Sequence, residues 1–451
     1  VFGPNEWAAR VAPWMGASLM AFGLYLYVRR WAGERMARAS VLVLATQPLF
    51  FGAAQFANLD MLVAGCIGLT VLAAAHAAQC AALGLPHRRW LLAACAFAAF
   101  GVLAKGLIGG VLPVLVLAAW LGFTRQWRLL PKLLSMPGLL VFLAIAAPWF
   151  VAMQSRFPDF FHYFFVVQHF QRFAGGGFNN ERPFWFFVPV LLGLALPWTA
   201  WLWRAIRPNG DRMDEPGASA LGVRSLMWAW LAVVLVFFSL PSSKLATYIL
   251  PATPPLAFLV AEAARAAWTG GRGRPWWTAS AALAATVCVG VVAVSVVLRL
   301  PSDATLAKAY ANAAAPDEPL VFMDAYFFDA VVYATLREPV QVVDDWGSPG
   351  VGAHDNWQRE LLDAATFASP ARRSVLVVPE QLAPMLCEKP VHWLMAPLSS
   401  TRRFTWLAGL APVASTRKTA LWRIDRDDAK VAAGLSCRID SAATRSPRSA
   451  T

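Results

Sequence analysis

Long apolar runs occupy the first two thirds of the chain, without the alternation of polar and apolar positions typical of a strand or surface helix. A run of roughly 18 apolar residues is long enough to cross the hydrocarbon core of a bilayer as a helix. The runs predict ten membrane spans, at about 8–27, 40–57, 61–83, 90–104, 106–123, 133–152, 184–203, 226–240, 245–263 and 276–300. The two spans on either side of Lys105 are short, which favours a tilted, kinked or partly re-entrant segment there.

The pattern changes to that of a soluble domain after residue 300. Short apolar runs at 319–323, 340–343, 374–379 and 419–424 predict strands, and 326–337 predicts a helix between the first two. Strand, helix and strand in this order are typical of a small α/β domain. We therefore expect three parts: a transmembrane domain over 1–300, an α/β domain over 301–427, and a polar, disordered tail over 428–451.

Composition and charge support a membrane protein and give its orientation. Hydrophobic residues make up 58% of the 451 positions and charged residues 14%, whereas a soluble domain has roughly half apolar and about a quarter charged residues. Every second loop is basic, which places these loops in the cytoplasm. The predicted fold is an α-helical polytopic membrane protein with about ten spans and a small extracytoplasmic α/β domain. The basic residues of these loops are Arg29, Arg30, Arg35, Arg38, His87, Arg88, Arg89, Arg125, Arg128, Lys132, Arg204, Arg207, Arg212, Arg224, Arg265, Arg272 and Arg274.

Neither the net charge of +13 nor the six cysteines indicates a nucleic-acid-binding or a metal-binding protein. Because the charges lie mainly in short loops between spans, they do not indicate nucleic-acid binding. No cysteine spacing is typical of a metal knuckle. Cys387 and Cys437 could pair if the C-terminal region is extracytoplasmic, although nothing in the sequence requires it.

Two ionisable residues lie at predicted span ends on the outer side. Asp60 precedes a span and is either the N-cap of a helix or an acidic group beside a catalytic pocket. Lys105 interrupts more than thirty otherwise apolar residues. It either extends to the membrane interface or faces an anionic partner inside the protein.

The outer loop at 153–183 carries the densest mixture of aromatic and charged residues. Its segment 163–173 predicts an amphipathic helix at the membrane interface. His169 and Arg172 lie three residues apart and so share a helix face. Arginine can bind phosphate with two hydrogen bonds, and histidine can donate a hydrogen bond or bind a metal. The alternative is an interfacial helix whose basic residues only touch lipid phosphates.

Lys244 and Tyr248 are four residues apart between two spans at the same surface. They could form an interfacial anchor pair. Together with Asp60, Lys105, His169 and Arg172, however, they predict a basic cleft suited to a phosphate-bearing lipid. No motif of a serine hydrolase, zinc protease or nucleotide-binding enzyme is present in the sequence.

Several ordered motifs resemble the 4-amino-4-deoxy-L-arabinose lipid A transferases and their neighbours, the bacterial relatives of protein mannosyltransferases with the GT-C fold. The resemblance covers roughly residues 2–265 and extends more loosely over the outer domain. The motifs are Pro148-Trp149, Pro158-Asp159-Phe160, Tyr163-Phe164-Phe165, His169-Phe170-Gln171-Arg172-Phe173-Ala174, Pro183-Phe184-Trp185-Phe186, Pro197-Trp198, Phe237-Phe238-Ser239, Lys244-Leu245-Ala246-Thr247-Tyr248-Ile249-Leu250-Pro251 and Ala104-Lys105-Gly106.

The resemblance implies a transferase that moves a sugar from undecaprenyl phosphate to lipid A on the periplasmic face of the inner membrane. It implies that His169 is associated with a divalent metal ion near the carrier phosphate, and that Arg172 and Tyr248 hold this phosphate. Lys105 and Lys244 are further candidates for binding the phosphate. Asp60 matches an acidic residue near the family's site.

The family's catalytic aspartate lies in a first outer loop that the sequence does not contain. We therefore expect an N-terminally truncated member that is inactive alone. Alternatives are a related transferase with another sugar or acceptor, such as a protein O-mannosyltransferase, a lipid or oligosaccharide transporter, and a non-catalytic scaffold. A transporter would be expected to have polar residues at the bilayer midplane and symmetric broken helices, which the sequence lacks.

Overall fold

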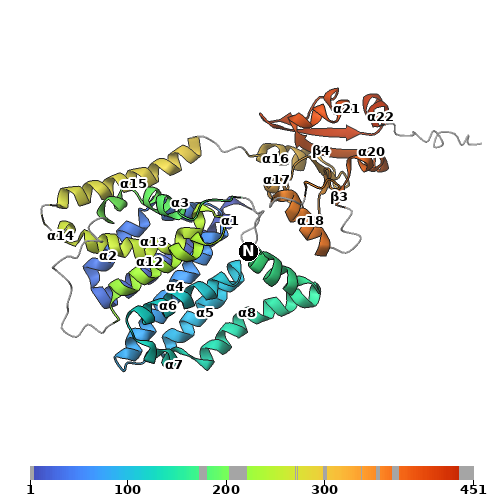
Figure 1. The fold of residues 1–451 in the computed structure, drawn as a ribbon. Coiled ribbons are helices and arrows are strands. Elements are labelled where there is room, and N and C mark those ends of the chain that lie inside the picture. Colours follow the sequence, from blue (N-terminus) through green and yellow to red (C-terminus); the bar gives the residue numbers. More distant parts are fainter. Residues whose placement is uncertain are drawn as a thin grey trace, which may run out of the picture. The chain divides into compact units, whose positions relative to one another are not determined.

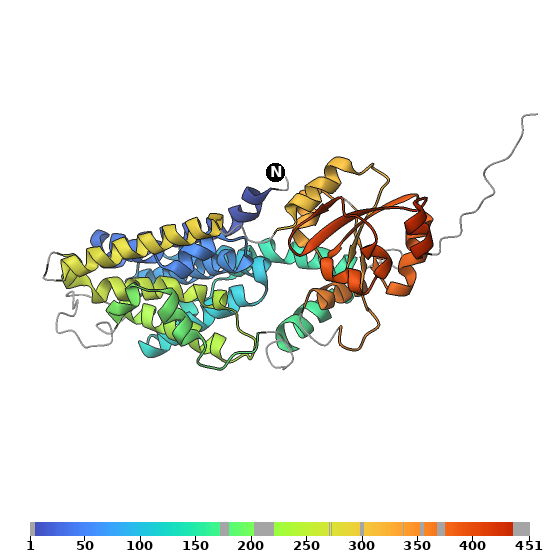
Figure 2. The ribbon, with the colours of Figure 1, turned by 90° about the horizontal axis from the view of Figure 1, so that it is seen from above.

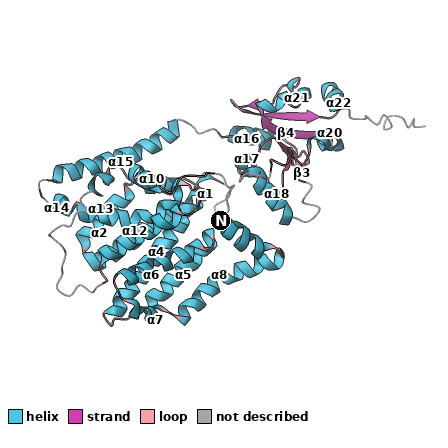
Figure 3. Cartoon of the chain, in the orientation of Figure 1, coloured by secondary structure: helices cyan, strands magenta, loops and turns pink. Residues whose placement is uncertain are grey.

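The computed structural model describes residues 5–171, 180–202, 221–269, 271, 273–297, 302–336, 338–351, 356–367 and 375–435. The chain divides into two compact units, one over Glu6–Leu298 and the other comprising Arg299–Thr451 with Val1–Asn5. The described part of the first unit is built of helices, whereas the sheet lies in the second (Figure 3).

The helices of the first unit occupy the predicted spans. Several pack against helices that are not their neighbours in the chain: α1 packs against α4, and α5 packs against both α4 and α8 (Figure 1). Their bounds are α1 (Glu6–Ala32), α2 (Glu34–Ala45), α3 (Pro48–Gln55), α4 (Leu59–Ala82), α5 (Arg88–Lys105), α6 (Ile108–Phe123), η1 (Trp127–Leu129), α7 (Leu130–Leu133), α8 (Met136–Arg156), η2 (His162–Gln171), α10 (Phe187–Leu194), η3 (Trp198–Trp201), α12 (Val223–Ser239), η4 (Ala246–Ala252), α13 (Thr253–Ala263), α14 (Arg265–Trp268) and α15 (Arg274–Val297).

Four helices of the described residues are individually long and apolar enough to cross a membrane: α1, α4, α8 and α15. The pair α2 and α3 would be a fifth span, broken by a bend of 64°. α6 and α12 are apolar but shorter. In the most apolar window of α4, 83% of the residues are buried, against 11% in α15. α4 therefore lies inside the helical unit, whereas α15 lies on its outside, as the yellow helix along the edge of the unit in Figure 2.

The two helices on either side of Lys105 form a tight hairpin. α5 ends at Lys105, and Gly106 follows with a φ of 92°, which a glycine adopts without strain. Gly101 of α5 and Gly109 of α6 then bring the two backbones together. A Cβ atom placed on Gly109 would lie 2.2 Å from the backbone carbon of Gly101. The short length of both predicted spans thus corresponds to a sharp turn between closely packed helices.

The aromatic residues of the predicted interfacial helix form a packed cluster. η2 is a π-helix, and Phe160, Phe164 and Phe165 pack against Phe150 of α8, with ring centroids 5.4–6.3 Å apart. Val102 of α5 belongs to the same apolar cluster. This cluster anchors the start of the outer loop to the helical unit, whereas Arg172 and the other residues up to 179 lie outside the described part of the chain.

The second unit contains a six-stranded sheet in the order β3-β2-β1-β4-β6-β5. β1, β2, β3 and β4 run parallel to one another, whereas β6 is antiparallel to β4 and β5. Its elements are α16 (Ala304–Ala313), β1 (Leu320–Met323), α17 (Phe328–Tyr333), β2 (Gln341–Val343), α18 (Trp357–Phe367), β3 (Leu376–Val377), α20 (Pro379–Glu388), β4 (Val391–Pro397), η5 (Leu398–Arg402), α21 (Thr405–Ala408), β5 (Ala414–Ser415), β6 (Thr419–Asp425) and α22 (Ala429–Leu435).

Two features of this unit differ from the sequence-based expectation. β4, which pairs with both β1 and β6, was not predicted. The expectation of a disordered tail from residue 428 is wrong for α22, because Val431 and Leu435 are buried in the apolar cluster of the sheet. The apolar residues of this short helix stabilise it by packing, although the surrounding sequence is polar.

The described cysteines of the helical unit are free thiols, whereas the described cysteine of the second unit forms a disulfide. Cys66, Cys80, Cys95 and Cys288 of the helical unit are free. Cys387 in α20 is disulfide-bonded, and Cys437 lies outside the described residues. Disulfides persist in oxidising compartments such as the bacterial periplasm.

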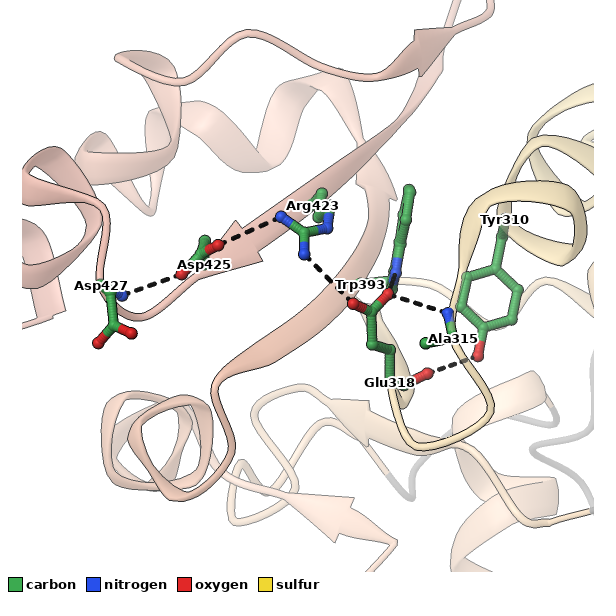
Figure 4. Close-up of polar contacts among 7 residues, drawn as sticks. All are labelled: Tyr310, Ala315, Glu318, Trp393, Arg423, Asp425 and Asp427. Carbon is green, nitrogen blue, oxygen red and sulfur yellow. Dashed lines mark hydrogen bonds and ion pairs between the residues drawn. The ribbon is translucent and has the colours of Figure 1, made fainter.

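Glu318 joins several elements of the second unit. Its carboxylate accepts hydrogen bonds from Trp393 Nε1 at 2.6 Å and Ala315 N at 3.2 Å, and it pairs with Arg423 Nη2 at 3.2 Å (Figure 4). The hydroxyl of Tyr310 donates to the Glu318 carbonyl at 2.8 Å. The hydrogen bond from Trp393, with those from Ala315 and Arg423, holds the pKa of Glu318 below its ordinary value despite partial desolvation.

We expect the second unit to lose stability at acidic pH through this carboxylate. A depressed pKa means that its stabilisation is present above the pKa of the unfolded chain and is lost as pH falls through the folded pKa. The substitution Glu318→Gln should cost about 1–3 kcal/mol near neutral pH and flatten the dependence on pH. Hydrogen exchange of β1 amides, corrected for intrinsic rates, measures both effects. Equal flattening by Glu380→Gln, at an exposed glutamate, would contradict the assignment to Glu318.

Candidate functional site

Asp60 lies in the first turn of α4 but does not cap it. The N-cap is Asn58, whose side chain accepts a hydrogen bond from Met61 N at 2.8 Å. The Asp60 carboxylate is therefore free for other partners. One oxygen pairs with Lys105 Nζ and the other accepts a hydrogen bond from the Thr247 hydroxyl. The interpretation of Asp60 as the N-cap of a helix is therefore wrong.

Lys105 is held from two sides at the C-terminal end of α5. Besides Asp60, its Nζ atom lies 4.5 Å from the centroid of the Tyr248 ring. An ammonium over an aromatic face is attracted by the ring, and a cation is also favoured at a helix C-terminus. The Lys105 side chain stays 35% exposed, against 14% for Asp60. The Lys105 side chain is therefore more accessible to an anion from solvent than the Asp60 carboxylate is.

Thr247 and Tyr248 bring a third part of the chain to this pair. Both lie in η4, a 3₁₀ helix that enters α13. The ring of Tyr248 also packs against Phe238 of α12, with centroids 5.8 Å apart. η4 contacts α4 and α12 directly. Thr247 was missed in the sequence, where its only signal is its place before Tyr248 in the Lys244–Pro251 motif.

Lys244 is buried and is bound by backbone carbonyls. Its Nζ donates to Arg182 O at 3.0 Å and to Pro241 O, and its backbone N donates to Asn180 O at 3.0 Å. Burial lowers the pKa of the Lys244 ammonium. The contacts tie the end of the outer loop to the segment before η4, so Lys244 is placed to position this loop.

The predicted residues thus fall into three groups. Asp60, Lys105 and Tyr248 meet in one cluster, which with Thr247 we call the Asp60 cluster. Lys244 lies four residues before Tyr248 and holds the adjoining loop end. For His169 the structure describes only the backbone within η2, and Arg172 lies outside the described residues. In the described ranges no three His, Cys, Asp or Glu residues are grouped so that they could hold a metal ion, and the metal role of His169 stays a prediction.

Comparison with known proteins supports the assignment of the chain to multi-pass membrane proteins. The family described as dolichyl-phosphate-mannose-protein mannosyltransferase matches residues 1–151. The structure of ArnT from Cupriavidus metallidurans bound to undecaprenyl phosphate superposes with a TM-score of 0.72 and 23% sequence identity, covering 93% of this chain and 84% of that one. Its apo form gives a TM-score of 0.69. The chain is therefore a multi-pass membrane protein with the GT-C fold and a small α/β domain.

Curated relatives are similar at the sequence level. The undecaprenyl phosphate-alpha-4-amino-4-deoxy-L-arabinose arabinosyl transferase of Pseudomonas paraeruginosa is 34% identical over 266 residues, which are 58% of this chain and 47% of that protein. The protein of the same name from Erwinia tasmaniensis is 36% identical over 265 residues, 58% of this chain and 46% of its own. The chain spans about half the length of these relatives. The resemblance seen in the sequence motifs is confirmed.

Proposed function

We propose that the chain belongs to an enzyme that transfers a sugar, 4-amino-4-deoxy-L-arabinose, from undecaprenyl phosphate to lipid A. The observation that carries this proposal is the similarity to curated transferases of that donor, in a chain with the fold of ArnT. The Asp60 cluster adds support, because it combines a partly exposed lysine side chain with a tyrosine where α4, α5 and η4 meet.

In this proposal Lys105 and Tyr248 bind the phosphate of the lipid carrier. The leaving phosphate gains negative charge as the bond to the sugar breaks, and a fixed cation stabilises it. Asp60 keeps the ammonium in place and Thr247 orients Asp60, so both act as positioning residues. Lys244 fixes the end of the outer loop through the carbonyls of Asn180 and Arg182. Arg172 would add a bidentate contact to the phosphate.

A related transferase with another acceptor is the second candidate. It is favoured by the match of residues 1–151 to the protein mannosyltransferase family. The acceptor is chosen by the shape of its pocket, and the two candidates share the lipid-linked donor. They differ in whether the sugar appears on lipid A or on proteins.

The experiment is mass spectrometry of lipid A from cells with and without the intact gene. We expect an aminoarabinose adduct that disappears in the deletion and returns with the intact gene. An unchanged lipid A spectrum, together with altered glycoproteins, would favour the second candidate. No change in either would overturn both.

We further propose that the enzyme lies in the inner membrane with the Asp60 cluster and the C-terminal domain in the periplasm. The basic loops predict this orientation, and the disulfide at Cys387 suits an oxidising compartment. An alkaline phosphatase fused after Thr451 should be active, and one fused within the basic loop at 125–128 should be inactive. The reverse pattern would contradict the orientation.

A further inference from the structure

A cavity of about 360 Å³ lies in the helical unit and contains no residue of the Asp60 cluster. Arg35, Arg38 and Leu42 of α2 line one side of it. Trp268 at the end of α14, Thr269 after it, and Trp277 of α15 line the other. The cavity is thus formed where α2 meets the end of α14 and the first turns of α15.

The charge in this cavity is positive. Arg38 Nε pairs with Glu34 Oε1 at 2.9 Å, and the other Glu34 oxygen pairs with Arg29 Nε at 2.9 Å. Arg35 is exposed and forms no ion pair with any residue that the structure describes. One carboxylate is therefore shared by two arginines, while a third arginine is left to bind an anion from outside the chain.

The opposite wall of the cavity consists mainly of two tryptophans that are held in place by other residues. Trp277 is buried and packs against Trp198 and Trp201, with ring centroids 4.8 and 6.0 Å apart. Trp268 donates its indole N–H to Ala261 O at 2.8 Å. Leu42 is 40% exposed, and α15 leaves most of its apolar surface outside the protein. Tryptophans of this kind mark the level of lipid headgroups.

We propose that this cavity binds the headgroup of an anionic phospholipid from the leaflet on the side of the basic loops. Arg35 and the free terminal nitrogens of Arg38 bind the phosphate oxygens, and Leu42, Trp268 and Trp277 contact the glycerol and the start of the acyl chains. Basic pockets between membrane helices on this side are suited to such headgroups. A soluble anion would gain nothing from the two tryptophans. This inference does not depend on the proposed transferase activity.

Native mass spectrometry of the intact protein in detergent tests the proposal. Phosphatidylglycerol and phosphatidylcholine with the same acyl chains are titrated separately, and the first bound lipid is counted. Arg35→Gln and Arg38→Gln should each weaken binding of phosphatidylglycerol about fivefold. Binding of phosphatidylcholine should be weaker in the wild type, because its choline cation is repelled by the arginines, and either substitution should weaken it less than it weakens binding of phosphatidylglycerol. Arg128→Gln with Lys132→Gln, in another basic loop on the same side, is the control and should bind as the wild type.

Three outcomes would overturn the proposal. They are equal phosphatidylglycerol binding by Arg35→Gln and the control, equal binding of the two lipids by the wild type, and displacement of the lipid by inorganic phosphate at comparable concentration. The last would indicate a site for phosphate alone. Because the Arg35 side chain is exposed, its replacement should leave folding intact, and an unchanged unfolding temperature verifies this for the variant.

Discussion

Replacing Lys105 by glutamine in the intact enzyme is expected to lower sugar transfer by about two orders of magnitude. The ammonium lies 4.5 Å from the Tyr248 ring and pairs with Asp60, and it is the cation that the described structure offers to an anion at this cluster. Glutamine keeps most of the side-chain volume but removes the charge that would stabilise the leaving phosphate. The initial rate of transfer to lipid A, measured in detergent, gives the effect.

A double-substitution cycle separates positioning by Asp60 from an independent role. If Asp60 acts by holding Lys105, then Asp60→Asn with Lys105→Gln should lose no more activity than the worse single variant. Losses that multiply would show that Asp60 acts separately. The matched control is Arg224→Gln, which breaks the ion pair with Glu262 elsewhere in the helical unit and should leave the transfer rate near that of the wild type.

The partners of this cluster could be foreseen only in part. Asp60, Lys105 and Tyr248 could be predicted because each breaks or ends an apolar run. Their pairing could not, since Asp60 and Lys105 are 45 residues apart and Thr247 is 187 residues from Asp60. The sequence also does not show whether Asp60 is itself the N-cap of α4 or lies two residues after the N-cap. The choice depends on Asn58, which accepts the hydrogen bond from Met61 N.

The fold could be predicted where the pattern of apolar residues within one element identifies that element. The spans were found because a helix in a bilayer must be apolar over its whole length. The break between α2 and α3 was missed, although Pro48 marks it at the first position of α3. β4 was missed for a different reason. It lies between β1 and β6, so five successive residues are buried, and a strand buried on both faces lacks the alternation that identifies an exposed one.

The second large effect is a loss of stability expected for Gly109→Ala, which lies in the α5–α6 hairpin that carries Lys105. The added Cβ would lie 2.2 Å from Gly101 C and 2.5 Å from Val102 N. These are backbone atoms that no change of rotamer can move, so α5 and α6 must separate. We expect a loss of about 3 kcal/mol, at the upper end for an overpacked site. Thermal unfolding in detergent measures the loss of stability.

The neighbouring glycine provides a control of opposite sign. A Cβ on Gly110 would lie 3.6 Å from Val102 Cγ2, an ordinary contact, and alanine within a helix is favoured over glycine by about 0.5–1 kcal/mol. Gly110→Ala should therefore raise the unfolding temperature slightly, while Gly109→Ala lowers it. Because α5 ends at Lys105, separation of the hairpin should also move the ammonium away from Asp60 and reduce transfer. A Gly109→Ala enzyme with wild-type stability and rate would show that this close approach does not position the site.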